Sequence, residues 1–231
     1  MKKTKNNKKL LENIDIAKIY EPIEAIKILK ENSYTKFEES FEVAIKLGID
    51  SNKSDQNIRG VISLPNGTGK NITVAVIAKG EKQIEAKEAG ADVVGENELI
   101  DSISLGKINF DLLIATPDMM PSVGKVAKIL GPKGMMPNPK LGTVTQDIKN
   151  AVENAKSGQV QYRNDKSGIV HAGFGKMNFN DDDLLQNLKV LFTSITKSKP
   201  DALKGSFIKK ITIASTMGVG LEVNASSLRW F

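Results

Sequence analysis

The stretch KFEESFEVAIKLGI, residues 36–49, shows the hydrophobic pattern from which the fold can be worked out. Apolar and polar side chains alternate along it, with Phe37, Phe41, Val43, Ile45 and Leu47 on one face and Lys36, Ser40, Glu42 and Lys46 on the other. Successive side chains of a strand point to opposite faces, so the pattern predicts a strand with one buried and one wet face. Taken alone, the period places Phe37 in the core. Because Phe37 is the first residue of the strand, a location at the rim of the core is the alternative.

The segment ITVAVIA, residues 72–78, shows a different pattern, because its apolar residues are continuous. A continuous run is typical of a parallel strand covered on both faces. Two further strands are predicted at 91–95 and 110–117, and four helices at 80–90, 96–106, 119–131 and 145–158. Strands that alternate with helices over short connections predict a small parallel sheet, and hence an α/β domain over residues 67–159.

The two ends of the chain return to alternating strands. We expect strands at 58–64, 159–164, 169–175, 209–216 and 218–224, and helices at 10–19, from Pro22 onward and at 179–200. The turn sequence DKSG, residues 165–168, predicts a hairpin between two of these strands. The fold class is therefore an α+β discontinuous domain of residues 1–66 and 160–231, with an antiparallel sheet and helices, into which the α/β domain of residues 67–159 is inserted.

One connection is unusual in composition. The segment GPKGMMPNPKLGT, residues 131–143, holds three glycines and three prolines, which are unsuited to the interior of a helix or strand. Disordered linkers seldom carry two methionines at their centre. The composition therefore predicts a rigid, basic and partly apolar loop.

The basic residues are unevenly distributed. The net charge is +6, with twelve Lys/Arg and ten Asp/Glu in residues 1–66, eleven of each in 67–159, and ten against six in 160–231. If the two ends fold together, they form one basic body beside a neutral one. A basic surface favours phosphate backbones or anionic membranes, but charge alone favours a merely soluble basic protein. The lysine-rich residues 1–9 are typical of a mobile tail.

Composition excludes several classes of function. The chain has no cysteine, which excludes disulfides and thiolate metal sites. There is no secretory signal pattern, and no apolar stretch reaches the roughly 18 residues of a membrane span. We therefore expect a soluble intracellular protein without membrane contact.

For each motif that resembles a catalytic site, a purely structural role explains the residues better than catalysis does. NGTGKN, residues 66–71, lacks the spacing and hydroxyl of a phosphate loop and precedes a strand, so a turn is favoured. His171 is the one histidine and makes a poor metal site. Asp181, Asp182 and Asp183 precede an apolar helix and suit its N-terminus. We expect no enzyme, cofactor or metal; a nucleotide-binding α/β enzyme remains the alternative.

Phosphate recognition without catalysis remains. The candidate cations lie in the basic ends: Lys36, Lys46, Arg163, Lys166, Lys209 and Lys210. The loop STMG, Ser215–Gly218, adds a glycine that could let a partner approach the backbone closely. Met217 could pack on a sugar or base, or fill the core, and the residues alone favour the core.

Several segments together resemble the ribosomal protein L-one family of the large subunit's mobile stalk. They are GPKGMMPNPKLGTV, KFEESFEVAIKLGID, SDQNIRGVISLPNGTGK, IAKGEKQIEAKEAGADVVG, FDLLIATPDMM, RNDKSGIVHAGFGK and STMG. They occur in the family's order and cover nearly the whole chain.

The resemblance implies a fold and a set of partners. It implies a discontinuous RNA-binding domain that holds both termini and an inserted Rossmann-like three-layer α/β domain. It implies that the chain is part of the large ribosomal subunit, binds large-subunit ribosomal RNA mainly through the first domain, and helps deacylated transfer RNA to leave the exit site. Many members also repress their own operon by binding a similar fold in its messenger RNA.

The resemblance also implies the site residues. It places Lys36, Phe37, Ser40, Thr216, Met217 and Gly218 at the RNA interface, with Lys46, Lys166, Gly168 and His171 as weaker transfers and Lys133 and Lys140 as secondary contacts. The resemblance therefore overrides the core assignment of Phe37 and Met217. An apolar edge formed by these two side chains and packed against riboses would suit a protein that recognises RNA by its shape. In the proline-rich loop the resemblance favours Met135 or Met136 tucked inward. Val219 stands where many members have proline, which predicts a less rigid loop, and the terminal SSLRWF has no counterpart.

Overall fold

The computed structural model describes residues 10, 14–15, 17–51, 53–200, 203 and 205–228. The predictions for the lysine-rich residues 1–9, for most of the first helix and for the last three residues of SSLRWF lie outside this range. The contacts divide the chain into two compact units, unit 1 with Met1–Gly69 and Val160–Phe231, and unit 2 with Lys70–Gln159. The crossings lie at residues 69/70 and 159/160, whereas the sequence pattern changes at 66/67 and 159/160.

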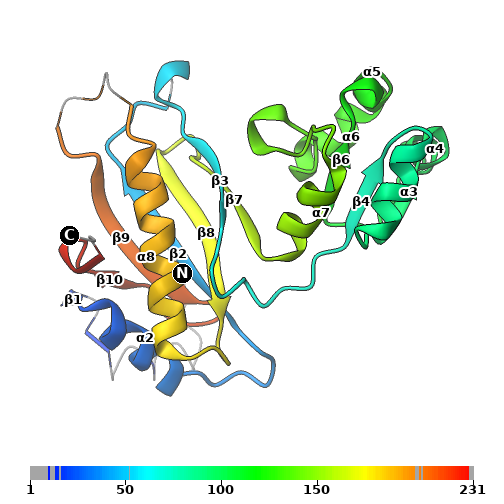
Figure 1. Ribbon diagram of the computed structural model, residues 1–231. Coiled ribbons are helices and arrows are strands. Elements are labelled where there is room, and N and C mark those ends of the chain that lie inside the picture. The colour runs from blue at the N-terminus through cyan, green and yellow to red at the C-terminus, as the bar shows by residue number, and fades with distance from the viewer. Residues whose placement is uncertain are drawn as a thin grey trace. The chain divides into compact units, whose positions relative to one another are not determined.

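Unit 1 is built on a five-stranded sheet in the order β1-β10-β9-β2-β8 (Figure 1). Its strands are β1 Ile19–Tyr20, β10 Leu221–Val223, β9 Ile208–Ser215, β2 Ser40–Leu47 and β8 Ile169–Lys176. The long strand β2 pairs antiparallel with β8 on one side and β9 on the other. The expected helix over 10–19 is wrong at its end, because Ile19 and Tyr20 pair in parallel with β10.

Helices α2 Pro22–Glu31 and α8 Asp181–Lys197 cover one face of this sheet (Figure 1). Pro22 begins α2, where its missing N–H costs nothing and its fixed φ suits a helix. Phe41, Val43, Ile45 and Leu47 of β2 are buried under the helices, while Glu42 and Lys46 are exposed on the other face. The predicted alternation of β2 is therefore confirmed, and the sheet keeps one open face.

The hairpin predicted around residues 165–168 is wrong in its strand pairing, because the two strands do not form a continuous ladder with each other. β7 Gln159–Arg163 joins β3 Arg59–Ser63 in a separate two-stranded sheet and meets β8 through the isolated bridge between Asn164 and Val170. The turn between them does form. Asp165 Oδ1 accepts hydrogen bonds from the N–H groups of Ser167 and Ile169, both at 2.8 Å.

Unit 2 has three parallel strands in the order β5-β4-β6, with β4 Val74–Ile77, β5 Val93–Gly95 and β6 Leu112–Ala115. All four residues of β4 are buried, which confirms the prediction from its continuous apolar run. Helices α3 Glu81–Glu88 and α7 Ile148–Lys156 share one apolar cluster with Val74 and Val76. Helices α4 Asn97–Ser104, α5 Met120–Val123 and α6 Ala127–Lys133 share another with Ala75 and Ile77, so helices cover both faces of the sheet.

The proline-rich segment contains more helix than its composition predicts. Gly131–Lys133 complete α6, with Pro132 inside the last turn, and Gly134 ends the helix at a φ of +73°. The predicted helix over 119–131 is instead broken, because turns of 3₁₀ helix, η2 Pro117–Met119 and η3 Gly124–Val126, flank α5. A third such turn, η4 Pro139–Leu141, follows, and Met135 and Met136 both pack against the core of unit 2.

A buried amide joins α8 to the segment that leaves unit 1. Asn187 is fully buried, and its Nδ2 donates hydrogen bonds to the carbonyls of Gly67 and Phe174, each at 2.9 Å. Its Oδ1 accepts from the N–H of Asn66 at 3.2 Å. The side chain therefore satisfies two backbone groups of the turn around NGTGKN, at Asn66 and Gly67, and one of β8, at Phe174.

We expect Asn187→Ala to lower the unfolding free energy by about 2 kcal/mol, because it leaves buried carbonyls without donors. Urea denaturation followed by circular dichroism measures the change. Lys197→Ala, an exposed position on the same helix, serves as control and should change stability by less than about 0.5 kcal/mol. Equal stabilities of the two variants would contradict this role for Asn187.

Candidate nucleic-acid interface

The predicted RNA-binding residues of unit 1 gather at opposite ends of β2. The rim cluster, at the start of β2 and the end of β9, contains Lys36, Phe37, Ser40, Thr216, Met217 and Gly218. The turn cluster, at the other end of β2, contains Lys46, Lys166, Gly168 and His171. Lys46 follows Ser40 by six positions along β2, so the clusters lie about 20 Å apart at roughly 3.3 Å per residue.

In the rim cluster, two segments far apart in sequence are held together by hydrogen bonds. Phe41 pairs with Ser215, which puts Ser40 opposite Thr216. Thr216 Oγ1 accepts from the N–H of Ser40 at 3.0 Å and lies 3.4 Å from the Ser40 carbonyl oxygen. The side chain of Thr216 thus continues the strand pairing by one residue beyond β9.

Two large apolar side chains of the rim cluster lie in solvent. Phe37 is 55% exposed and Met217 is 47% exposed. The core assignments drawn from the residues alone are therefore wrong for both, and Phe37 lies at the rim that its first strand position left open. The strand begins only at Ser40, and the chain bends at Lys36 and Phe37, so the alternation does not extend to Phe37.

Glu39 is the central polar residue of this region, and no sequence pattern singled it out. Its side chain is 1% exposed. Oε1 lies 2.8 Å from Ser33 Oγ and 2.7 Å from Thr35 Oγ1, and Oε2 accepts from the N–H of Met217 at 3.1 Å. The Ser215 hydroxyl also donates to this carboxylate. Glu39 therefore joins the segment around Phe37 to the loop that carries Met217.

The hydrogen bonds keep Glu39 ionised in spite of its burial. Burial by itself would raise the pKa of this carboxyl. Hydrogen bonds from Ser215, Thr35, the N–H of Met217 and Ser33 outweigh that effect and hold the pKa below its usual range.

Gly218 has an intramolecular reason for its missing side chain. A Cβ at this position would lie 2.4 Å from Ser215 Oγ and 3.4 Å from Leu29 Cδ2. Glycine therefore leaves room for the Ser215 hydroxyl that reaches Glu39. Close approach of a partner to the Gly218 backbone stays a prediction.

The turn cluster is polar and more exposed. Lys46, Lys166 and His171 are exposed, and Lys46 lies opposite Lys210 in the sheet. His171 Nε2 lies 3.7 Å from Asp165 Oδ2. The N–H of Ile169 contributes most to lowering the pKa of Asp165, with burial opposing and the N–H of Ser167 and His171 adding to the effect.

Gly168 differs from the other residues of the turn cluster. It is buried, adopts a φ of +72°, and its carbonyl accepts from the N–H of Leu47 at 2.9 Å. A positive φ of this size favours glycine, so the turn itself explains the residue. Its contact with RNA stays a prediction.

The open face between the clusters is lined by small side chains. A shallow depression of about 360 Å³ lies over Ala44, Gly173, Thr212 and Ala214, with Glu42 and His171 at its border. Among the described residues, no group of three His, Asp or Glu side chains could hold a metal ion. The face therefore suits an extended partner that contacts a broad, shallow surface.

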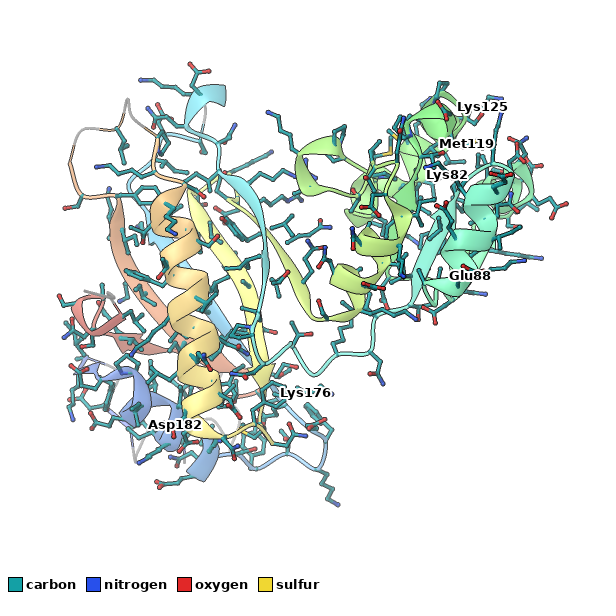
Figure 2. The ribbon with its side chains drawn as sticks, viewed as in Figure 1. Lys82, Glu88, Met119, Lys125, Lys176 and Asp182 are labelled. Atoms are coloured by element: carbon teal, nitrogen blue, oxygen red, sulfur yellow. The ribbon has the colours of Figure 1, made fainter. Side chains whose placement is uncertain are left out.

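Lys133 and Lys140, the proposed secondary contacts, are exposed on unit 2. Figure 2 labels Glu88 on α3 and Lys125 on η3, two exposed side chains of opposite charge in the same unit. The mixed charge matches the eleven basic and eleven acidic residues of 67–159. Contact of unit 2 with RNA stays a prediction.

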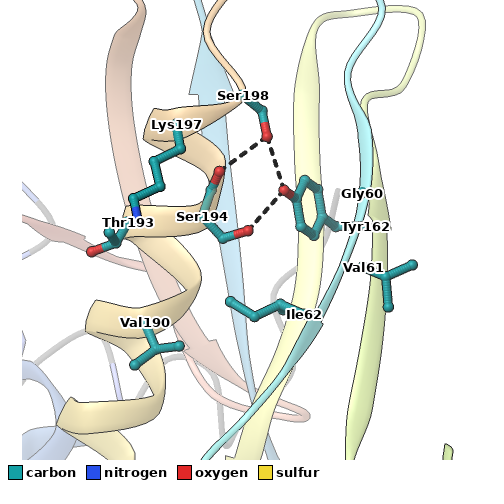
Figure 3. Close-up of a pocket in the computed structure, with 9 residues that line it drawn as sticks. All are labelled: Gly60, Val61, Ile62, Tyr162, Val190, Thr193, Ser194, Lys197 and Ser198. Atoms are coloured by element: carbon teal, nitrogen blue, oxygen red, sulfur yellow. Dashed lines mark hydrogen bonds between the residues drawn. The ribbon is translucent and has the colours of Figure 1, made fainter. Parts of the chain in front are cut away.

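A larger depression in unit 1, of about 600 Å³, lies between β3, β7 and α8 (Figure 3). Tyr162 Oη lies 3.0 Å from Ser194 Oγ and 3.1 Å from Ser198 Oγ. The other lining side chains are Val61, Ile62, Val190, Thr193 and Lys197, with Gly60. This set contains neither a carboxylate nor a histidine, so it offers no general base at neutral pH.

The NGTGKN segment folds as a turn against α8. Gly67 and Gly69 adopt φ values of +65° and +69°, and a Cβ at Gly69 would meet the Phe179 ring at 3.0 Å. Its backbone is engaged by Asn187, as described above. Within the described part of the chain, no helix is long and apolar enough to cross a membrane.

Comparison with known proteins gives a consistent result. A family model described as the ribosomal protein L1p/L10e family matches residues 29–219. A protein named large ribosomal subunit protein uL1 from Rickettsia peacockii (strain Rustic) is 57% identical over 210 residues, which cover 91% of this chain and 88% of the relative. The protein of the same name from Rickettsia bellii (strain OSU 85-389) has the same identity and coverage.

We expect Glu39 to stabilise the fold at neutral pH and to lose this effect in acid. Its folded pKa is lower than the ordinary value of about 4.3, so the stabilisation is complete above that value and is lost as the pH falls through the folded pKa. Urea denaturation of the wild type and Glu39→Gln at about pH 7 and pH 3 measures it. The gap between the two proteins should narrow in acid, and a gap independent of pH would contradict an ionised Glu39.

Proposed function

The chain belongs to the ribosomal protein L1p/L10e family, and from that premise we propose that it binds large-subunit ribosomal RNA through the rim cluster and the open sheet face of unit 1. Membership gives the chain a structural role in the large ribosomal subunit rather than an enzymatic one. The RNA-binding surface, the further RNA partners and the residues that contact them are the proposal.

The exposed pair Phe37 and Met217 carries this proposal. A single exposed apolar side chain is ordinary on a protein surface, but these two stand on segments that Glu39 and Thr216 hold together, and it is this pairing that points to a partner. An aromatic ring and a thioether suit ribose edges and unstacked bases, and the polar Ser40 and Thr216 beside them suit sugar and phosphate oxygens. The combination favours RNA over an apolar protein groove.

Charge supports the choice of unit 1. Residues 1–69 and 160–231 carry the whole basic excess, with 22 Lys/Arg against 16 Asp/Glu. The exposed Lys36, Lys46 and Lys166 lie in the two clusters at the ends of the open face. Lysines placed in this way steer phosphate backbones, while the apolar pair gives the contact its position. Lys133 and Lys140 would add a weaker contact from unit 2.

The wider role follows from the family. We propose that the chain forms part of the stalk of the large subunit and assists the release of deacylated transfer RNA from the exit site. The same surface would bind its own operon's messenger RNA where that RNA repeats the ribosomal fold, and so repress translation. The place of action is the ribosome in the cytoplasm, without a membrane contact.

A nucleotide-binding α/β enzyme is the competing function, since unit 2 has a parallel sheet with helices on both faces. We expect calorimetric titration of the protein with ATP, GTP and NAD to show no saturable binding, because NGTGKN forms a turn packed on α8. A dissociation constant in the micromolar range for any of the three would revive this alternative.

We expect Phe37→Ala and Met217→Ala each to weaken binding to a stalk transcript of large-subunit ribosomal RNA by about tenfold or more, because each removes an apolar contact of roughly 1–3 kcal/mol. Filter binding at fixed salt measures the affinity. Both side chains are exposed, so the unfolding free energy should change little.

Leu105→Ala is the matched control for this pair. Leu105 is 76% exposed on unit 2, so its truncation removes a comparable exposed apolar group outside the proposed surface. We expect unchanged affinity for this variant. Unchanged affinity for Phe37→Ala and Met217→Ala as well would refute the site assignment.

A further inference from the structure

The carboxylate of Glu39 is an expensive group to bury, and the RNA contacts proposed above do not use it. It is 1% exposed and cannot reach a partner. Its donors come from two separate segments, Ser33 and Thr35 on one side and Ser215 and Met217 on the other. A buried carboxylate that no surface contact requires calls for a function inside the fold.

We propose that Glu39 is a positioning residue that fixes the rim cluster in its RNA-binding arrangement before RNA arrives. This inference rests on the proposed function and extends it to a residue that never touches the ligand. Phe37 lies two positions after Thr35 and two positions before Glu39. Met217 donates its own N–H to the Glu39 carboxylate. Both exposed apolar side chains therefore stand on backbone that Glu39 holds.

The geometry around Glu39 is suited to rigidity. Its backbone carbonyl accepts from the N–H of Met177 at 2.9 Å, which attaches the same residue to the end of β8. The Thr35 hydroxyl also lies 2.9 Å from the Phe37 carbonyl oxygen, so it is placed to serve either acceptor. Three chain segments therefore converge on one residue.

Prior ordering of the two loops lowers the cost of binding. Side chains and loops that become ordered on association reduce affinity, and a pre-organised surface avoids that loss. Gln at position 39 keeps the shape but has one acceptor oxygen and no charge, so in either orientation it cannot accept from the donors on both sides of the carboxylate as Glu39 does. The substitution should therefore loosen the loops while leaving Phe37 and Met217 in the chain.

The test is a double-mutant cycle measured by filter binding to the stalk transcript, at a temperature where every variant is folded. We expect Glu39→Gln to weaken binding about tenfold. In the Phe37→Ala/Met217→Ala background the same substitution should weaken it less than about threefold, because the side chains through which Glu39 acts are gone. Amide hydrogen exchange at Met217 should be faster in Glu39→Gln than in the wild type.

Two comparisons separate positioning from general destabilisation. Asn187→Ala destabilises the same unit from a distant contact, and we expect its RNA affinity to stay within about twofold of the wild type. Ser215→Ala removes one donor but keeps the carboxylate, and should weaken binding by a smaller factor than Glu39→Gln. It replaces Glu39→Gln in the cycle if that variant does not fold.

The outcomes are distinguishable from failure of the proposed function. Wild-type affinity in Glu39→Gln, or an equal loss in both backgrounds, would overturn the positioning role while RNA binding through Phe37 and Met217 stands. A wild-type protein that does not bind the transcript would overturn the proposed function, and this inference with it.

Discussion

The pairing of β2 with β8 and β9 is the constraint on which the rest of unit 1 depends. β2 comes before the inserted unit and both of its partners come after it, so the two ends of the chain must meet to form the sheet. A slip of one residue would turn Glu42 and Lys46 into the core and Phe41 into water, which no burial of apolar surface could offset. The same register sets Ser40 opposite Thr216, so the rim cluster is a consequence of how the core is filled.

Local sequence patterns correctly predicted those strands whose buried faces can be read from the order of apolar and polar residues. The alternation of residues 40–47 and the continuous run of 74–77 identify a one-sided and a two-sided strand, because side-chain direction follows directly from strand geometry. Pro22 marks the start of α2 for an equally local reason. The site residues were found through family likeness, and the structure brings six of them together at one end of β2 and four at the other.

The misses share one physical origin, which is that they depend on partners distant in sequence. Periodicity does not say where a strand begins, so Phe37 was first placed in the core. The turn at Asp165 predicts that the chain reverses, but whether β7 pairs with β8 or β3 is decided by residues 59–63. Glu39 looks like a solvent residue beside Glu38, because the donors that allow its burial include Ser215 and Met217, some 176 and 178 positions away.

The donors around Glu39 are uncharged, and this fits the RNA-binding role that we propose for the surface above it. A lysine partner would neutralise the carboxylate, but beside RNA its charge would be drawn toward phosphates, and the contact would weaken in the bound state. Hydroxyl and backbone N–H donors are attracted to phosphates less strongly than a lysine, because they carry no net charge. They stabilise the ionised carboxylate without using any lysine of unit 1 and without the entropy cost of fixing a long side chain. A neutral donor set thus lets one region combine a hydrogen-bonded interior with a surface whose cations stay available to the RNA that we propose as its ligand.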